Sequence, residues 1–225
     1  MNDSLAVAVP RPASFRFQTW HIFTLVTCAT VGLAWFTNEH IVTREVYHRL
    51  LDGRLEAARI DRNFDVFRQT ATWGYYATPL LLALRIAFVT LVLQLFLYLF
   101  GANEIAFSAL FRTTTLGYVA FLWEASMRAL YLASIDIARV DMASFSLVPN
   151  SLASLFRGSL DAKSPLYSFL SLLNVYEAAW IGAVIFMLAD MCRVRRRLAI
   201  LVVMATWGLL TSIQWIVAVL SMKLS

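Results

Sequence analysis

The stretch from Ser168 to Ala199 constrains this chain most, because it is an apolar run long enough to cross a lipid bilayer and it ends in a cluster of arginines. About 20 apolar residues span the hydrocarbon core of a bilayer, and clusters of Lys and Arg stay on the cytoplasmic side. The cluster consists of Arg193, Arg195, Arg196 and Arg197. We therefore predict a transmembrane helix whose arginine end lies at the cytoplasmic lipid headgroups.

The composition indicates an integral membrane protein. The chain has 225 residues, of which 60% are hydrophobic, and its mean hydropathy is +0.68. A soluble domain of this length does not need so much apolar surface for its core. The net charge of +5 would also suit a nucleic-acid-binding protein, but most of the basic excess lies in the arginine cluster beside a predicted helix. We therefore expect membrane lipids, and no nucleic acid, as partners.

Further apolar runs predict an all-α integral membrane protein: a five-helix transmembrane bundle with amphipathic interfacial segments. The helices are expected at 17–36, 79–100 and 113–135, in the stretch 168–199, and at 198–220. The start of the chain lacks the apolar core of a signal peptide, so we expect the first helix to remain. Three regions follow: 1–37 with a polar tail and the first helix, 38–74 as an amphipathic extracytoplasmic segment, and 75–225 as a four-helix domain that includes an interfacial segment at 136–167.

The segment from Asn38 to Gly74 is distinct because acids and arginines are interleaved along it in matched number. Apolar residues recur between them at three- and four-residue spacing, which predicts an amphipathic helix interrupted or bent at Gly53. A second short turn is expected at 64–67, and Pro79 suits the first turn of the next helix. This segment is predicted either to connect two helices along the membrane surface or to dock a partner outside the membrane.

Segment 136–167 contains no run long enough to cross a bilayer. Pro149, Gly158 and Pro165 divide it into short amphipathic pieces, which indicates a re-entrant or interfacial hairpin. With the arginine cluster cytoplasmic, alternation of the helices places the N-terminus and the 101–112 loop on the cytoplasmic side. The 38–74 segment, the 136–167 segment and the C-terminus are then extracytoplasmic.

Charged residues also lie within the predicted helices: Arg85, Glu124, Arg128 and Glu177. Three of them are about 15 Å from a helix end at 1.5 Å per residue, close to the bilayer midplane, and Arg128 is one turn nearer the outside. An uncompensated charge at that depth costs roughly 2.5–3.5 kcal/mol on insertion scales, so we predict that the four form a neutral structural cluster. Glu124 and Arg128 are spaced to pair on one helix face, and Arg85 and Glu177 are predicted to pair between helices.

Two functional interpretations of this cluster stay open: contact with a partner protein, and a path for an ion or small solute. Balanced ion pairs move protons poorly, because each partner stabilises the charged form of the other. The sequence also lacks two Gly- or Pro-interrupted apolar segments at corresponding positions, which are the usual pointer to a transport site. Transport is therefore the second hypothesis, and a water-filled cavity that reaches these side chains would favour it.

Small residues at four-residue spacing predict helix faces that approach closely. Such faces are formed by Thr24, Cys28 and Gly32 on the first helix, by Ala178 and Gly182 on the fourth, and by Gly208 and Ser212 on the fifth. We expect these faces to pack within the bundle or against a partner.

Residues that would support catalysis are sparse. His21 is predicted near the cytoplasmic end of the first helix, whereas His40 and His48 lie in the outer segment, so the three cannot form one metal site. The sequence contains no HExxH, no GxSxG and no phosphate-binding glycine loop. We therefore predict a protein that is not an enzyme and holds no metal or other cofactor.

The chain from about Gly101 onward resembles the Yip family, the Ypt-interacting proteins and their bacterial relatives. The residues that carry the resemblance are Gly101, Phe107, Leu110 and Gly117-Tyr118, then SLASLF at 151–156, and above all LLNVYEAAWIGAVIFML at 172–188 with the basic turn after it. This last stretch is similar to the family's Leu-Asn-aromatic-x-x-x-Trp helix. Tyr176 stands where phenylalanine is common in the family, Glu177 is an unusual charge there, and segment 38–74 has no matching counterpart.

The resemblance implies a five-helix membrane scaffold or accessory subunit without catalytic activity. Eukaryotic members of the family are linked to small GTPases and vesicle traffic, and bacterial relatives include accessory components of ABC-type exporters. The short N-terminal tail is more similar to the bacterial branch, which implies the bacterial inner membrane. Our leading hypothesis from sequence is therefore an accessory subunit that binds other integral membrane subunits, such as those of an ABC-type exporter.

Overall fold

The computed structural model describes residues 19–51, 55–102, 105–136, 144–145, 147–156, 159 and 164–224. The regular structure of these residues is helical, apart from one isolated antiparallel bridge between Ser151 and Asn174. The predicted all-helical fold is therefore confirmed. The polar tail and the bend expected at Gly53 lie outside the described residues, as does much of segment 136–167.

The first predicted transmembrane helix is α1 (Thr19–Phe36), which continues directly into a π-helical turn, η1 (Thr37–Ile41). The turn is wider than an α-helix because the Val42 N–H donates to the Thr37 carbonyl five residues earlier. After it the chain forms α2 (Arg44–Leu51).

The next helix, α3 (Ala57–Leu99), has 43 residues and is about 65 Å long at 1.5 Å per residue. It is roughly twice as long as a bilayer core requires. The expectation that a helix begins near Pro79 was wrong, as was the expectation of a separate short turn at 64–67, because α3 runs through both places without a break. A proline removes only one backbone hydrogen bond, and here the Thr78 hydroxyl adds a bond of 2.8 Å to the Gly74 carbonyl in the preceding turn.

The third predicted helix is divided into α4 (Phe107–Gly117) and α5 (Val119–Ser134) by an irregular turn at Tyr118. The fourth is divided into α8 (Pro165–Leu172) and α9 (Val175–Asp190). At the second break Asn174 is extended, with φ −134° and ψ 165°, and its side chain accepts a hydrogen bond of 2.8 Å from the Glu177 N–H. A side-chain cap of this kind starts a new helix.

The backbone freed at this break is hydrogen-bonded by the segment around α7 (Leu152–Leu155). The Leu152 N–H donates to the Leu173 carbonyl at 2.9 Å, and the Val175 N–H donates to the Asn150 carbonyl at 3.3 Å. The described part of segment 136–167 therefore supports the start of α9. The last helix is α10 (Arg196–Leu224).

Three helical stretches are long and apolar enough to cross a membrane, by length and composition: Thr19–Ile41, Ala57–Leu99 and Arg196–Ser221. The expected count of five is not reached among the described residues, since the breaks at Tyr118 and at 173–174 leave shorter helices. Both breaks lie inside runs that hydropathy alone treats as continuous.

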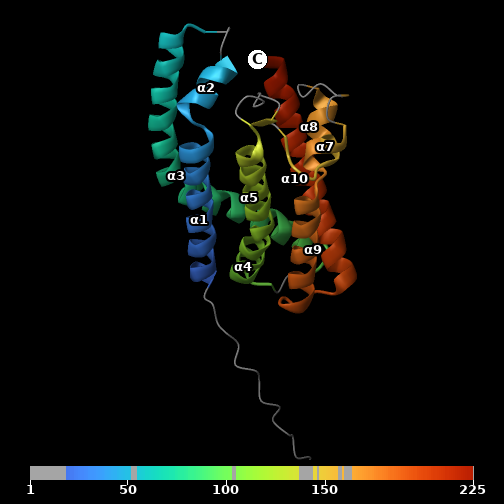
Figure 1. Ribbon diagram of the computed structural model, residues 1–225. Coiled ribbons are helices and arrows are strands. Elements are labelled where there is room, and N and C mark those ends of the chain that lie inside the picture. The colour runs from blue at the N-terminus through green and yellow to red at the C-terminus, as the bar shows by residue number, and fades with distance from the viewer. Residues whose placement is uncertain are drawn as a thin grey trace, which may run out of the picture.

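The helices pack side by side, and the later part of α3 passes behind α5 (Figure 1). At one end of the bundle lie the start of α1, the start of α4 and the turn from α9 to α10. At the other end lie α2, α8 and the end of α10.

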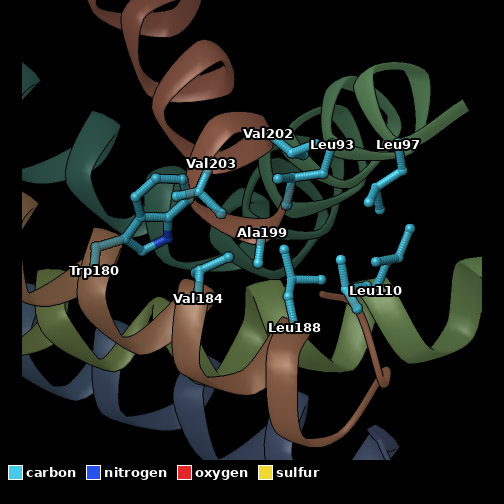
Figure 2. Packing of buried hydrophobic residues seen from close by; sticks show 10 residues of the cluster. Leu93, Leu97, Leu110, Trp180, Val184, Leu188, Ala199, Val202 and Val203 are labelled. Atoms are coloured by element: carbon cyan, nitrogen blue, oxygen red, sulfur yellow. The ribbon is translucent and has the colours of Figure 1, made fainter. Parts of the chain in front are cut away.

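The largest buried cluster joins four helices at the arginine end of the bundle. Figure 2 shows Trp180, Val184 and Leu188 of α9 directed toward Ala199, Val202 and Val203 of α10, with Leu93 and Leu97 of α3 and Leu110 of α4 closing the group. Because lipid is as apolar as these side chains, close packing and not transfer from water stabilises such a contact within a membrane.

The small-residue faces predicted from sequence do not make the close helix contacts within this chain. Thr24, Cys28, Gly32, Ala178, Gly182 and Ser212 are exposed, and a Cβ added at Gly32, Gly182 or Gly208 would meet nothing within 4 Å. The residues that do pack lie on neighbouring faces and are larger, such as Phe23 and Val26 on α1. The glycine at which two helices do approach closely is Gly117, at the contact of α4 with α9, where an added Cβ would lie 2.8 Å from Val184 Cγ2.

Candidate functional site

A cavity of about 580 Å³ lies between α1, α3, α5, α9 and α10. It extends from Arg85 and Tyr118 inside the bundle to Asn38 and Ser171 near the end that carries η1 and α8. The charged residues predicted at membrane depth all line this one cavity: Arg85, Glu124, Arg128 and Glu177. The wall also contains uncharged polar residues, namely Thr30, Thr37, Asn38, Ser171, Asn174 and Gln214, and the rest of it is aliphatic and aromatic.

Glu124 and Arg128 lie on the same face of α5, as their spacing predicts. Arg128 Nη2 is 3.4 Å from Glu124 Oε1, and both side chains are partly buried. The contact is long for a charge-assisted hydrogen bond, but it brings opposite charges together one helical turn apart. These two residues therefore neutralise one another inside the cavity.

Arg85 does not form the predicted ion pair with Glu177. Its guanidinium carbon lies 5.5 Å from the ring centroid of Tyr118 and 5.4 Å from that of Phe121. Arg85 interacts electrostatically with Glu177, but the separation exceeds the 4.0 Å limit of an ion pair. The turn at Tyr118 places two aromatic faces beside α3, and a guanidinium stacks favourably on such faces.

Glu177 lies in the first turn of α9 and not midway along a continuous helix, as the sequence suggested. Its backbone N–H is capped by Asn174, which also lines the cavity. The adjacent Tyr176 is fully buried, and its hydroxyl accepts a hydrogen bond of 3.1 Å from Asn150 Nδ2. The break in the helix therefore fixes the backbone from which the Glu177 carboxylate reaches the cavity.

A second cavity of about 170 Å³ adjoins the first and shares Arg85, Glu177 and Gln214 with it. Trp207 also lines this smaller cavity, and its buried indole Nε1 has no hydrogen-bond partner. The indole lies beside the Glu177 carboxylate without reaching hydrogen-bond geometry. A buried polar atom left without a partner costs free energy unless water or a ligand supplies one.

Sequence reasoning missed Asn174, Tyr118 and the helix break as parts of the site. A single asparagine within an apolar run was a usable signal, because Asn favours helix N-caps over helix interiors. No comparable signal marked Tyr118, whose role depends on where α3 passes.

In the segment expected outside the membrane, α2 packs as a hairpin against the start of α3, and we call this pair the outer hairpin. Arg44 contacts Asp61 at 2.8 Å and Asp65 at 2.9 Å, and Arg68 pairs with Glu39. His48 Nε2 lies 2.9 Å from Asp61 Oδ1. This hydrogen bond is the main cause that lowers the pKa of Asp61, opposed by desolvation and assisted by the charge of Arg44.

The predicted lipid-headgroup arginines lie together at the opposite end of the bundle. Arg193, Arg195, Arg196 and Arg197 are exposed around the α9–α10 connection. Val194 between them is buried, and its N–H donates to the Leu188 carbonyl at 3.1 Å. This bond ties the turn to α9 and leaves the arginine side chains outside.

The site combines charges of both signs with uncharged polar, aromatic and aliphatic walls. Among the residues that the structure describes, no three or more His, Cys, Asp or Glu side chains lie close enough together to hold a metal ion. No family model, curated protein or solved structure matches this chain.

Proposed function

We propose that this chain is a membrane protein that binds a small polar solute in the cavity between α1, α3, α5, α9 and α10 and carries it through the membrane. The observation that supports this proposal is that all four intramembrane charges line one cavity of about 580 Å³. A charged side chain at membrane depth is tolerated where it faces protein or a water-filled space. The cavity supplies that space.

Two further features support transport. Broken helices are common at transport sites, and α9 starts at a break where the Asn174 cap fixes the backbone of Glu177 beside the cavity. The π-helical turn η1 contributes Thr37 and Asn38 to the same wall. Widened turns of this type are frequent at functional sites.

The proposal includes a topology. It has five membrane crossings, which are formed by α1, by the later part of α3, by α4 and α5 together, by α9 and by α10. The arginine cluster then lies at the cytoplasmic face of a bacterial inner membrane, and the outer hairpin and the C-terminus are extracytoplasmic.

Water in the cavity is tested by cysteine labelling in intact membranes. In a Cys28→Ala/Cys192→Ala background, Ala125→Cys places a thiol on the cavity wall, whereas Leu130→Cys places one on the same helix at a residue that is 63% exposed outside the cavity. Thiolates form and react in water and not in hydrocarbon. A hydrophilic membrane-impermeant maleimide is therefore expected to label Ala125→Cys and to leave Leu130→Cys unlabelled.

Solute binding is then measured by thermal unfolding of the purified protein with small polar solutes, since a ligand that binds only the folded state raises the unfolding temperature. Equal labelling of the two cysteine variants, or no labelling of Ala125→Cys, would contradict a hydrated cavity. Solute-dependent unfolding temperatures that also respond to changes at Glu177 would support the proposal.

An accessory-subunit role is a second candidate, favoured by the exposed small-residue faces of α1, α9 and α10. Such faces allow a helix of another subunit to approach closely. This role also accords with the Yip-like residues and with a partner such as an ABC-type exporter. Mass spectrometry after purification in mild detergent tests it: a stoichiometric partner that is lost on Gly182→Leu supports an accessory subunit, and a lone protein contradicts it.

A further inference from the structure

The charges in the cavity are not equivalent. Glu124 and Arg128 contact one another, whereas Arg85 and Glu177 make no ion pair among the described residues. Arg85 and Glu177 also share a second property, because both line the large and the small cavity. The pair at the junction of the two cavities is thus one cation and one anion, each without a direct counter-charge among the residues that the structure describes.

Arg85 is held in a way that leaves its hydrogen-bond donors free. Its guanidinium carbon lies over the rings of Tyr118 and Phe121. This cation–π contact gives the N–H donors of Arg85 no oxygen acceptor, so they stay available to a ligand. A guanidinium can donate two of these bonds at once to a carboxylate or a phosphate.

Glu177 offers the complementary half. Its backbone is fixed by Asn174, and its carboxylate lies on the cavity wall beside the unpartnered indole of Trp207. It interacts with the charge of Arg85 across the intervening space without touching it. An ammonium group is the natural counter-charge for this carboxylate.

A ligand with one charge would satisfy one of the two residues and leave the other uncompensated at membrane depth, where a lone charge is costly. A ligand that carries both an anionic and an ammonium group satisfies both and keeps the cavity neutral. We infer that the cavity binds a zwitterionic group, with its carboxylate or phosphate at Arg85 and its ammonium at Glu177; this rests on the proposed solute site. The group belongs either to a free zwitterionic solute or to a zwitterionic lipid headgroup.

The test uses ω-amino acids of increasing length: glycine, β-alanine, 4-aminobutyrate and 6-aminohexanoate. Butyrate and butylamine serve as single-charge controls. Protection of Ala125→Cys from labelling and the unfolding temperature of the wild-type protein are measured for each compound. At least one amino acid is expected to protect and to stabilise at concentrations about tenfold or more below those of both controls, since each lost charge-assisted contact weakens binding about 10- to 100-fold.

Variants assign the two ends of the ligand. Arg85→Gln and Glu177→Gln are each expected to weaken binding of the amino acid about 10- to 100-fold. Arg85→Lys and Glu177→Asp keep the charges and are expected to weaken it less, which separates charge recognition from a folding defect. Butylamine binding should survive Arg85→Gln and butyrate binding should survive Glu177→Gln, because each still meets its own counter-charge.

A parallel arm uses nanodiscs of phosphatidylglycerol with or without phosphatidylethanolamine. One outcome is that phosphatidylethanolamine protects Ala125→Cys while no amino acid does, and that this protection is lost in Arg85→Gln and in Glu177→Gln. That result would support the inference, assign the zwitterion to lipid and contradict a free solute. If Ala125→Cys is labelled but no zwitterion protects it, or if butyrate or butylamine protects it equally well, the inference is overturned and the hydrated cavity still stands. If Ala125→Cys is not labelled, the proposed function fails, and the absence of a zwitterion-specific rise in unfolding temperature overturns the inference independently.

Discussion

Two arginines on α3 make the same kind of aromatic contact but differ in whether they form an ion pair. The guanidinium carbon of Arg68 in the outer hairpin lies 5.4 Å from the ring centroid of Phe64, and that of Arg85 in the cavity lies 5.4 Å from the ring centroid of Phe121. Arg68 also forms an ion pair with Glu39, whereas Arg85 forms none among the described residues. The unpaired arginine is thus the one nearer the middle of the bundle.

The free-energy cost of an unpaired charge predicts the opposite: the arginine at membrane depth should be the one that forms an ion pair. An ion pair at a water-exposed site contributes little, with typical values of about 0.2–1 kcal/mol, while an unpaired charge at membrane depth costs several times as much. If the only purpose of Arg85 were structural, pairing with Glu177 would be the less costly arrangement. The proposed solute site would account for its separation from Glu177, because water or a ligand would then complete the site.

The largest expected effect comes from reversing each arginine. Arg85→Glu places a third carboxylate near Glu124 and Glu177, and we expect it to lower the free energy of unfolding by about 3 kcal/mol or more. Arg68→Glu in the outer hairpin is expected to lower it by about 1 kcal/mol or less, because water screens the repulsion from Glu39. Thermal unfolding in mild detergent measures both.

Equal losses in the two variants would contradict the contrast between the regions. Adding Glu177→Arg to Arg85→Glu provides a further check. Full recovery of stability would show that the two residues pair directly, as the sequence suggested, whereas the geometry predicts only partial recovery through their longer-range attraction.

An intermediate effect is expected in the wall that positions the Arg85 site. Gly117 precedes Tyr118, and a Cβ there would lie 2.8 Å from Val184 Cγ2 and 3.1 Å from Trp180 Cδ1. Gly117→Ala is therefore expected to cost about 1–3 kcal/mol through overpacking. Gly182→Ala is the matched control, since its Cβ meets nothing within 4 Å, and improved helix propensity makes it neutral or stabilising by up to about 1 kcal/mol. Similar unfolding temperatures for the two variants would contradict the close contact at Gly117.

These glycines show what the sequence could predict. Hydropathy identified the apolar helices, and the spacing of Glu124 and Arg128 identified their contact. Spacing alone did not identify which small residues pack, because Gly117 and Gly182 both lie in apolar runs and only the path of α9 past α4 distinguishes them. The sites of close packing depend on helix crossings, which a one-dimensional pattern does not contain.

The sequence predicted which charged residues lie together, but not which of them contact one another. Equal depth along continuous helices suggested an Arg85–Glu177 pair, but that estimate assumed an unbroken fourth helix. The break at Asn174 moved Glu177 to the start of α9, and the turn at Tyr118 gave Arg85 aromatic faces to stack on. Both changes arise from local backbone irregularities that hydropathy averages away.

The smallest expected effect is a pH response confined to the outer hairpin. The pKa of Asp61 is lowered, chiefly by the hydrogen bond from His48. A carboxyl with a lowered pKa in the folded state stabilises that state above its unfolded pKa of about 3.9, and this contribution is lost as the pH falls through the folded value. We therefore expect contacts between α2 and α3 to be retained from pH 7 to about pH 4 and to weaken below it.

Hydrogen exchange of α2, corrected for the intrinsic rate at each pH, measures this response. Asp61→Asn should lower the protection of α2 at neutral pH, where Asp61 is ionised, and should remove the dependence of this protection on acid. Asp65→Asn leaves the His48–Asp61 contact in place and should keep that dependence. Exchange of α9 should not follow the titration of Asp61, because α9 does not belong to the outer hairpin. Two results would contradict this separation: a loss of protection in α2 that begins well above pH 4, or a loss that α9 shares. Either result would show that the outer hairpin and the cavity unfold together, so that Arg68 and Arg85 belong to one unit.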